Sequence, residues 1–282
     1  MVERVSAMAL ASLPMYALPE LRPAQAALWA GIAADLRRHG VADVPLALAE
    51  EQPAGVIWSS PALLLSQCCG ADLVGAWAGR LVPLATPCYR AQGCAGARYV
   101  SLVVVRAGAP ARALEDLRGT VAAINHPDSH SGSNALRALI APLARHGRFF
   151  GRVEVSGSHA ASLAMVADGQ ADVAAIDCVS HALLARHRPA ALAGTRVLCR
   201  TAAAPALPFV TRAGAGADLV ERLRTALRRA CAEPALAAAR DALLLDSIAV
   251  LPPSAYRRIP AFARLAARHG CPTLRRTSSG AP

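Results

Sequence analysis

The sequence predicts an α/β protein with two lobes, and three observations support this. The chain has 282 residues, which is too long for one small core and sufficient for two lobes of ordinary size. Hydrophobic residues make up 54% of it, enough for two packed interiors. Strand-like and helix-like segments alternate along the chain, which is typical of an α/β fold with largely parallel sheets.

The first part of the chain is expected to form most of the first lobe. Gly40 follows an amphipathic run and is a typical helix C-cap, and Pro61 favours the first turn of a helix. The Val-rich run before Arg106 predicts a central strand. We predict strands at residues 9–13, 44–49, 55–58, 81–85 and 99–105, and helices at residues 24–39 and 61–69.

A loop after Arg106 marks the start of the second lobe. We predict strands at 121–124, 153–155, 171–176, 197–200 and 209–211, and helices at 132–144, 158–168, 217–231, 234–244 and 256–269. Lobe 1 is then residues 1–105 and 205–282, lobe 2 is residues 106–204, and two crossings form a two-strand hinge. A ligand is expected between the lobes, at strand carboxyl ends and helix amino ends. The polar tail at 275–282 is expected to be disordered.

Composition excludes several classes of function. The net charge is +11 and every basic residue is Arg, but no dense basic run with interleaved aromatics indicates nucleic-acid binding. The positive balance favours small anions. No segment has the roughly 20 apolar residues that a membrane helix needs. The N-terminal apolar run is too short for a secretory signal, so we expect either a cytoplasmic chain or a mature or truncated one.

The eight cysteines do not indicate a metal site, because they form no C-x-x-C units and no His lies at ligand spacing from them. We expect neither a metal nor a cofactor. Cys88 and Cys94 flank a loop and can pair in an oxidising compartment. Buried free thiols are the favoured alternative, since Cys often behaves as a small hydrophobic residue.

The strongest chemical motif is the run Ser129, His130, Ser131 and Gly132, which follows a predicted strand and opens a predicted helix. A helix amino terminus presents unpaired N–H donors and partial positive charge, and Gly132 allows close approach of the backbone. Such a turn suits a tetrahedral anion, and His130 would add charge at mildly acid pH. Ordinary N-capping by Ser is the alternative.

Two further polar residues follow predicted strands. His159 lies at the start of a helix and can donate a hydrogen bond to an anion, although a lone His is more often a surface or core residue. Asp177 follows an apolar strand. It is expected either to bind a ligand or to cap the helix that follows it.

In the first lobe, Tyr16, Trp58 and Tyr89 lie at predicted strand ends, where each can line a cleft and offer a polar group. Hydrophobic packing is the alternative for all three. Ser59 precedes the helix predicted at residue 61, so it is expected to add a second set of donors.

Catalytic motifs are weak. There is no G-x-S-x-G elbow, no Walker A pattern and no G-x-G-x-x-G after a strand. If the chain is an enzyme, His159 and Asp177 are its candidate acid–base pair.

In the order and spacing of several short segments, the chain resembles the phosphate/phosphite/phosphonate-binding proteins of ABC transporters, which have the type 2 periplasmic-binding-protein fold. The resemblance covers about residues 9–272, and its segments are 12–16, 58–61, 64–67, 85–89, 93–101, 116–119, 129–132, 157–159 and 174–177. It implies that Ser129, Ser131 and Gly132 hold phosphonate oxygens and that His159 and Asp177 contact the ligand. It also implies that the first-lobe aromatics line the cleft.

The resemblance therefore implies a monomeric solute-binding protein that closes its lobes around phosphate, phosphite or a phosphonate and delivers it to a permease. It also implies a periplasmic location, while the missing signal leaves the cytoplasm open. Two alternatives stay open, a lyase or precursor-synthesis enzyme on the same fold and a cytoplasmic sensor domain.

Overall fold

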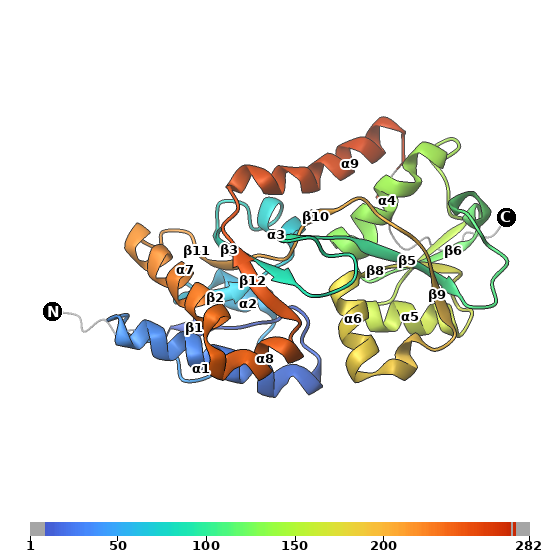
Figure 1. The fold of residues 1–282 in the computed structure, drawn as a ribbon. Helices are drawn as coiled ribbons and strands as arrows, with labels where there is room; N and C mark the ends of the chain where they lie inside the picture. Colours follow the sequence, from blue (N-terminus) through green and yellow to red (C-terminus); the bar gives the residue numbers. More distant parts are fainter. Residues whose placement is uncertain (1–8, 272, 275–282) are drawn as a thin grey trace. The chain divides into compact units, whose positions relative to one another are not determined.

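A computed structural model describes residues 9–271, 273 and 274. Residues 1–8 and the tail at 275–282, for which we made predictions from the sequence, lie outside the described residues. The chain forms two compact units (Figure 1). Of the described residues, 9–90 and 206–253 form unit 1, and 91–205 with those from 254 onward form unit 2.

The boundaries of the units differ from the predicted ones. The strand over residues 101–106 pairs on both sides within unit 2, and the last helix also belongs to that unit. The chain therefore passes between the units three times, near residues 90, 205 and 253, where we expected two crossings near residues 105 and 205. No local feature of the sequence predicts the third crossing, because it depends on the pairing of strands that lie about 70 residues apart in the chain.

Unit 1 contains a five-stranded sheet in the order β1-β2-β11-β3-β12. Strands β1 and β2 are parallel, and β11 runs antiparallel to both β2 and β3. Strands β1, β2 and β3 therefore run in the same direction. The strands are β1 Leu10–Ala11, β2 Leu63–Gln67, β3 Leu81–Tyr89, β11 Phe209–Arg212 and β12 Leu245–Ala249.

The helices of unit 1 pack on this sheet and on one another. Leu28, Ile32 and Leu36 recur every four residues and are buried along one side of α1, as the helical periodicity predicted. Helix α1 contacts α7 and α8, and α7 contacts β3 and β12. The helices are α1 Arg22–Arg38, α2 Ala54–Ser59, α3 Gly70–Val74, α7 Ala217–Ala232 and α8 Ala237–Ala242.

Unit 2 contains a second five-stranded sheet in the order β7-β6-β8-β5-β9. Strands β7, β6 and β8 are parallel, while β5 is antiparallel to both β8 and β9. The strands are β5 Ser101–Arg106, β6 Val121–Ile124, β7 Arg152–Val155, β8 Val173–Asp177 and β9 Thr195–Arg200, and a small ribbon pairs β4 Arg98–Tyr99 with β10 Ala204–Pro205.

The helices of unit 2 are close to those predicted. A π-helical turn over His130–Asn134 continues directly into α4. Helix α9 lies beside α4 (Figure 1), and α5 and α6 contact β8. The helices are α4 Ala135–Ile140, α5 His159–Ala167, α6 Cys178–His187 and α9 Arg258–Arg268.

The expectation of largely parallel sheets is wrong, because both sheets are mixed. In unit 1 the antiparallel strand β11 lies between β2 and β3, and in unit 2 the antiparallel strand β5 lies between β8 and β9. Neither strand directly follows one of its neighbours in the sequence. Alternation of strands and helices along the chain indicates an α/β fold, but it does not reveal a strand that enters a sheet from another part of the chain.

Three local predictions in unit 1 are also wrong. Residues 44–49 form no strand, and Pro45 cannot donate a ladder hydrogen bond. Residues 55–58 lie in helix α2, where Ile57 and Trp58 are buried and Val56 is exposed. The predicted helix at 61–69 contains instead the fully buried strand β2. Short apolar runs of this length do not distinguish a strand from a helix.

Candidate functional site

The candidate site of unit 2 lies where its three parallel strands end. Because β6, β7 and β8 run in the same direction, the segments that follow them emerge at one edge of the sheet. These segments carry the polar residues predicted from the sequence, at 125–133, 156–159 and 177–178. Carboxyl edges of this kind commonly bind ligands in α/β proteins.

The turn after β6 forms a helix amino terminus with a hydroxyl cap. The Oγ of Ser129 accepts a hydrogen bond from the backbone N–H of Gly132 at 3.2 Å, and the π turn and α4 then continue without a break to Ile140. The first N–H groups of such a helix have no partner inside the helix. The turn therefore combines Ser side chains with backbone donors, as predicted. It also shows that Ser129 acts as an N-cap.

Ser131 pairs with the predicted histidine from the next segment. Its Oγ lies 3.0 Å from Nε2 of His159, the first residue of α5. Burial lowers the pKa of His159 to about 4, and the backbone carbonyl of Ala175 acts in the opposite direction. At neutral pH the imidazole is therefore uncharged and has a single N–H to donate.

Three buried polar atoms on the two segments that carry this pair have no hydrogen-bond partner among the described residues. They are Oδ1 of Asn125, Oγ of Ser133 and Nδ1 of His159. A Cβ atom on Gly132 would lie 1.9 Å from Asn125 Oδ1 and 3.3 Å from His159 Cε1, so any larger residue here would require the Asn125 side chain to move. Buried polar groups in proteins are usually hydrogen-bonded. Of the five such atoms among the described residues, three lie on these two segments.

His130 does not belong to this set, which corrects the prediction that it contacts the ligand. It is only 2% exposed, and its ring packs edge-on against Phe262 with centroids 4.9 Å apart. Its Nδ1 is 3.2 Å from the side-chain amide of Asn134. Burial lowers its pKa to about 4. The expectation that it gains charge at mildly acid pH is therefore wrong, because the ring lies in the core.

Asp177 lies at the predicted edge and is used as a helix cap. Its Oδ1 accepts hydrogen bonds from the N–H groups of Val179 at 2.7 Å and Ser180 at 3.0 Å, and the residue is 2% exposed. Of the two predicted roles, the structure therefore shows capping of α6.

If capping is the main role of Asp177, its substitutions should separate stability from binding. We expect Asp177→Ala to lower the free energy of unfolding by about 1 kcal/mol, the usual cost of a lost cap. Asp177→Asn keeps a side-chain oxygen for the cap and should lose less than half of that. Urea unfolding of both variants measures this, and an Asn variant as unstable as the Ala variant would contradict it.

Unit 1 brings together two of the predicted aromatics at the carboxyl ends of its same-direction strands. The rings of Tyr16 and Tyr89 meet edge-on, with centroids 5.4 Å apart. Gln67, the last residue of β2, donates from Nε2 to Tyr89 Oη at 3.0 Å and to the carbonyl of Leu207 at 3.0 Å. Gln67 was not predicted as a site residue, since its position depends on β2, which was predicted as a helix.

Trp58 and Ser59 both lie in helix α2, so the predictions that Trp58 ends a strand and that Ser59 precedes a helix are wrong. Trp58 is 7% exposed. It donates from Nε1 to Ser66 Oγ at 3.0 Å and packs edge-on against Trp77, so the packing alternative holds. Ser59 ends helix α2 instead of preceding a helix, and its hydroxyl donates to the carbonyl of Val56 at 2.8 Å. It supplies no helix-N-terminal donors.

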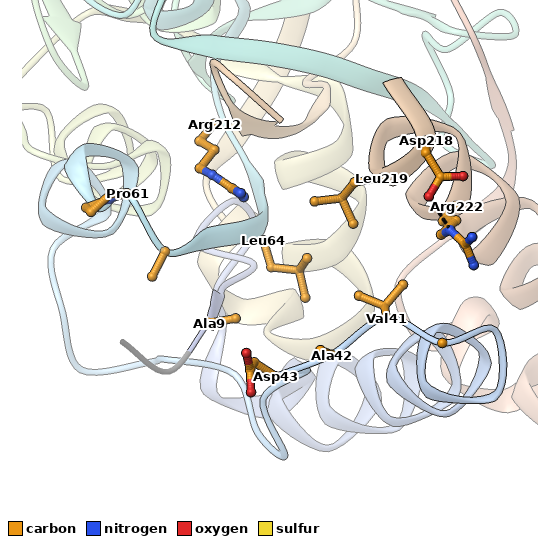
Figure 2. A pocket seen from close by; sticks show the side chains of 12 residues that line it. Ala9, Val41, Ala42, Asp43, Pro61, Leu64, Arg212, Asp218, Leu219 and Arg222 are labelled. Carbon is orange, nitrogen blue, oxygen red and sulfur yellow. Dashed lines mark hydrogen bonds and ion pairs between the residues drawn. The ribbon is translucent and has the colours of Figure 1, made fainter. Parts of the chain in front are cut away.

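Unit 1 also has an open cavity of about 680 Å³ (Figure 2). Its walls include Ala9, Pro61 and Arg212, which mark the amino ends of β1 and β2 and the carboxyl end of β11. The cavity therefore lies at the edge of the sheet opposite Tyr16, Gln67 and Tyr89. None of the residues predicted to bind ligand lines it.

The described residues contain neither a metal-binding cluster nor a membrane-spanning helix. No group of three or more His, Cys, Asp or Glu side chains in this part of the chain is arranged to hold a metal ion. No helix among these residues is both long and apolar enough to span a bilayer.

Solved structures with the same fold come from several bacteria. A binding-protein component of an ABC phosphonate transporter from Pseudomonas aeruginosa matches with a TM-score of 0.72 and 16% identity, over 93% of this chain and 87% of that chain. PhnD1 from Prochlorococcus marinus, in complex with methylphosphonate, matches with a TM-score of 0.71 and 14% identity, over 91% and 97%. A Xanthomonas citri protein bound to ATP matches with a TM-score of 0.69 and 19% identity, over 93% and 98%.

At these identities the structures establish the fold, the two-lobed periplasmic-binding-protein architecture that the resemblance implied. No curated protein sequence matches the chain. The family described as "ABC transporter, phosphonate, periplasmic substrate-binding protein" matches residues 73–253, more than half of the chain. The chain therefore belongs to the family of periplasmic substrate-binding proteins of ABC phosphonate transporters.

Proposed function

We propose that this solute-binding protein holds a phosphorus oxyanion, such as a phosphonate, phosphite or phosphate, at the carboxyl edge of the unit 2 sheet. The observation that carries the proposal is the Ser131–His159 pair. Nδ1 of His159 and the hydroxyl of Ser133, two positions after Ser131 in the same turn, are also buried and have no partner among the described residues.

The chemistry of these groups suits a tetrahedral oxyanion. The helix that starts at the 130–134 turn offers backbone N–H groups and partial positive charge. The hydroxyls of Ser131 and Ser133 rotate freely and can donate to ligand oxygens. Neutral His159 either donates directly from Nε2 or orients the Ser131 hydroxyl. Hydrogen bonds to a charged acceptor contribute about 1.5–3 kcal/mol each, so a few of them provide useful affinity.

Tyr16, Gln67 and Tyr89 of unit 1 are proposed to contact the organic part of a phosphonate. Tyrosine combines an apolar ring with a hydroxyl, which suits a small alkyl or aminoalkyl group. Closure of the two lobes on the ligand and a monomeric state both stay predictions. Members of this family work with a permease, and we propose the same partner here.

The enzyme alternative is not favoured, because the family consists of transporter binding proteins. The acid–base pair that it required is also engaged otherwise. Asp177 caps α6 through Oδ1, and His159 lies against Ser131. No specific observation favours the sensor alternative.

Calorimetric titration in phosphate-free buffer tests the proposal. The panel is methylphosphonate, aminoethylphosphonate, phosphite, phosphate and sulfate, with ATP added because the Xanthomonas citri protein was solved with it. We expect at least one phosphorus oxyanion to bind with micromolar affinity or better. At 100 times its Kd, that ligand should also stabilise the fold by about 2.7 kcal/mol. Absence of binding by every phosphorus compound at millimolar concentration would contradict the proposal.

A further inference from the structure

Two cysteines of unit 2 lie in contact beside the candidate site. Sγ of Cys94 is 3.6 Å from Sγ of Cys178, although the residues are 84 positions apart in sequence. Cys178 is the first residue of α6 and directly follows the cap Asp177. It is buried, while Cys94 is partly exposed on the loop before β4.

The backbone is shaped for this close approach. Gly93 has a φ of 105°, a conformation that side-chain-bearing residues rarely adopt. A Cβ atom at this position would lie 3.1 Å from Cβ and 3.3 Å from Sγ of Cys178. The N–H of Cys178 donates to the carbonyl of Val100 at 3.1 Å, and that of Cys94 to Ala91 at 2.9 Å. Both thiols are therefore held by ordered backbone, and a glycine admits the loop against the helix.

We propose that Cys94 and Cys178 form a redox-active thiol pair that closes into a disulfide within unit 2. The oxidant is a small-molecule or protein disulfide. The Cys94 thiolate attacks it and releases one thiol, leaving a mixed disulfide on Cys94. Cys178 then loses its proton, attacks the Cys94 sulfur and releases the second thiol. Two protein thiols are oxidised and one external disulfide is reduced to two thiols.

The environment favours this order of attack. Cys94 is the more exposed of the two, so an external disulfide reaches it first. The hydrogen bond from Cys178 lowers the pKa of the Cys94 thiol. The same hydrogen bond and burial raise the pKa of the Cys178 thiol. Attacking thiols are typically exposed and have a lowered pKa, while the buried Cys178 suits the second step.

The pairing differs from the one considered from the sequence, in which Cys88 and Cys94 flank a loop. Cys88 belongs to unit 1 and Cys94 to unit 2, and the neighbour of Cys94 is Cys178. Digestion with trypsin distinguishes a Cys88–Cys94 bond from a Cys94–Cys178 bond, because cleavage after Arg places the three cysteines on three different peptides. The peptides 81–90, 91–98 and 153–186 each contain a single cysteine, Cys88, Cys94 and Cys178 respectively.

The test equilibrates the purified protein with oxidised and reduced glutathione, blocks the remaining thiols and digests without reduction. We expect mass spectrometry to find peptide 91–98 joined to peptide 153–186. Oxidation should also raise the Tm by about 5–10 °C, since a bond that closes a long loop restricts the unfolded chain. Cys94→Ser and Cys178→Ala should each abolish both effects, and the control Cys199→Ser should keep both.

Two results would overturn the proposal. The first is complete alkylation of both cysteines in the fully oxidised buffer. The second is recovery of peptide 91–98 joined to 81–90, which would support the Cys88 pairing. Both readouts are independent of ligand binding, so they do not depend on the proposed function.

Discussion

Replacing Ser131 and His159 together with alanine is expected to weaken binding of the best phosphorus oxyanion at least about a hundredfold. The two side chains are 3.0 Å apart, and in the proposed complex each donates one charge-assisted hydrogen bond to the ligand in place of their mutual contact. Each such bond contributes about 1.5–3 kcal/mol, and every 1.4 kcal/mol is tenfold in affinity. Calorimetric titration of both proteins with the same ligand measures the change.

The matched control is Ser254→Ala with His269→Ala. It removes the same two residue types from unit 2, at positions that are exposed. The control should bind like the original protein, and the circular dichroism spectra of both variants should be unchanged. A site variant that is folded and binds within threefold of the original would contradict the site assignment.

Acid is expected to destabilise the protein through His130, by up to about 3 kcal/mol. The ring is buried, and its pKa in the folded protein is about 4 against an ordinary 6.5. Between these values the unfolded chain binds a proton that the folded chain does not, so stability is retained above pH 6.5 and falls as the pH decreases to 4. Each unit of difference corresponds to 1.36 kcal/mol.

His130→Asn isolates this contribution, because Asn keeps an oxygen near the side-chain amide of Asn134 but does not titrate. His159 titrates in the same range and is present in both proteins, so the difference between their urea-unfolding curves reports on His130. We expect the original protein to lose about 3 kcal/mol more than the variant between pH 7 and pH 4. Parallel losses in the two proteins would show that His130 is not the cause.

Unit 2 was predictable from the sequence to a large extent. The strand at Val121–Ile124 and the helix capped by Ser158 have the predicted bounds within one or two residues. Their signals are local, such as a short apolar run, a Ser before a helix, or a Gly after one. Unit 1 was harder, because the segment from residue 44 to residue 69 consists of short apolar runs. Leu63–Gln67 is a strand because it pairs with β1 and β11 in the interior of the sheet. No local sequence pattern predicts this pairing.

The candidate site divides in the same way. Ser129, Ser131, Gly132 and His159 could be predicted as candidates because each follows a strand and opens a helix, which can be recognised locally. The difference between Ser131 and its neighbour His130 was not predictable. It depends on which side of the turn faces α9, whose Phe262 packs on the imidazole. Gln67 was missed because its role depends on which element contains it.

The most direct test of the central claim is nuclear magnetic resonance of ¹⁵N-labelled protein during titration with methylphosphonate, or with the tightest ligand of the panel. We predict that the largest shifts fall on the backbone amides of residues 129–133 and 157–159 and on the imidazole of His159. Shifts confined instead to residues 40–43 and 212–222, around the unit 1 cavity, would contradict the proposed site.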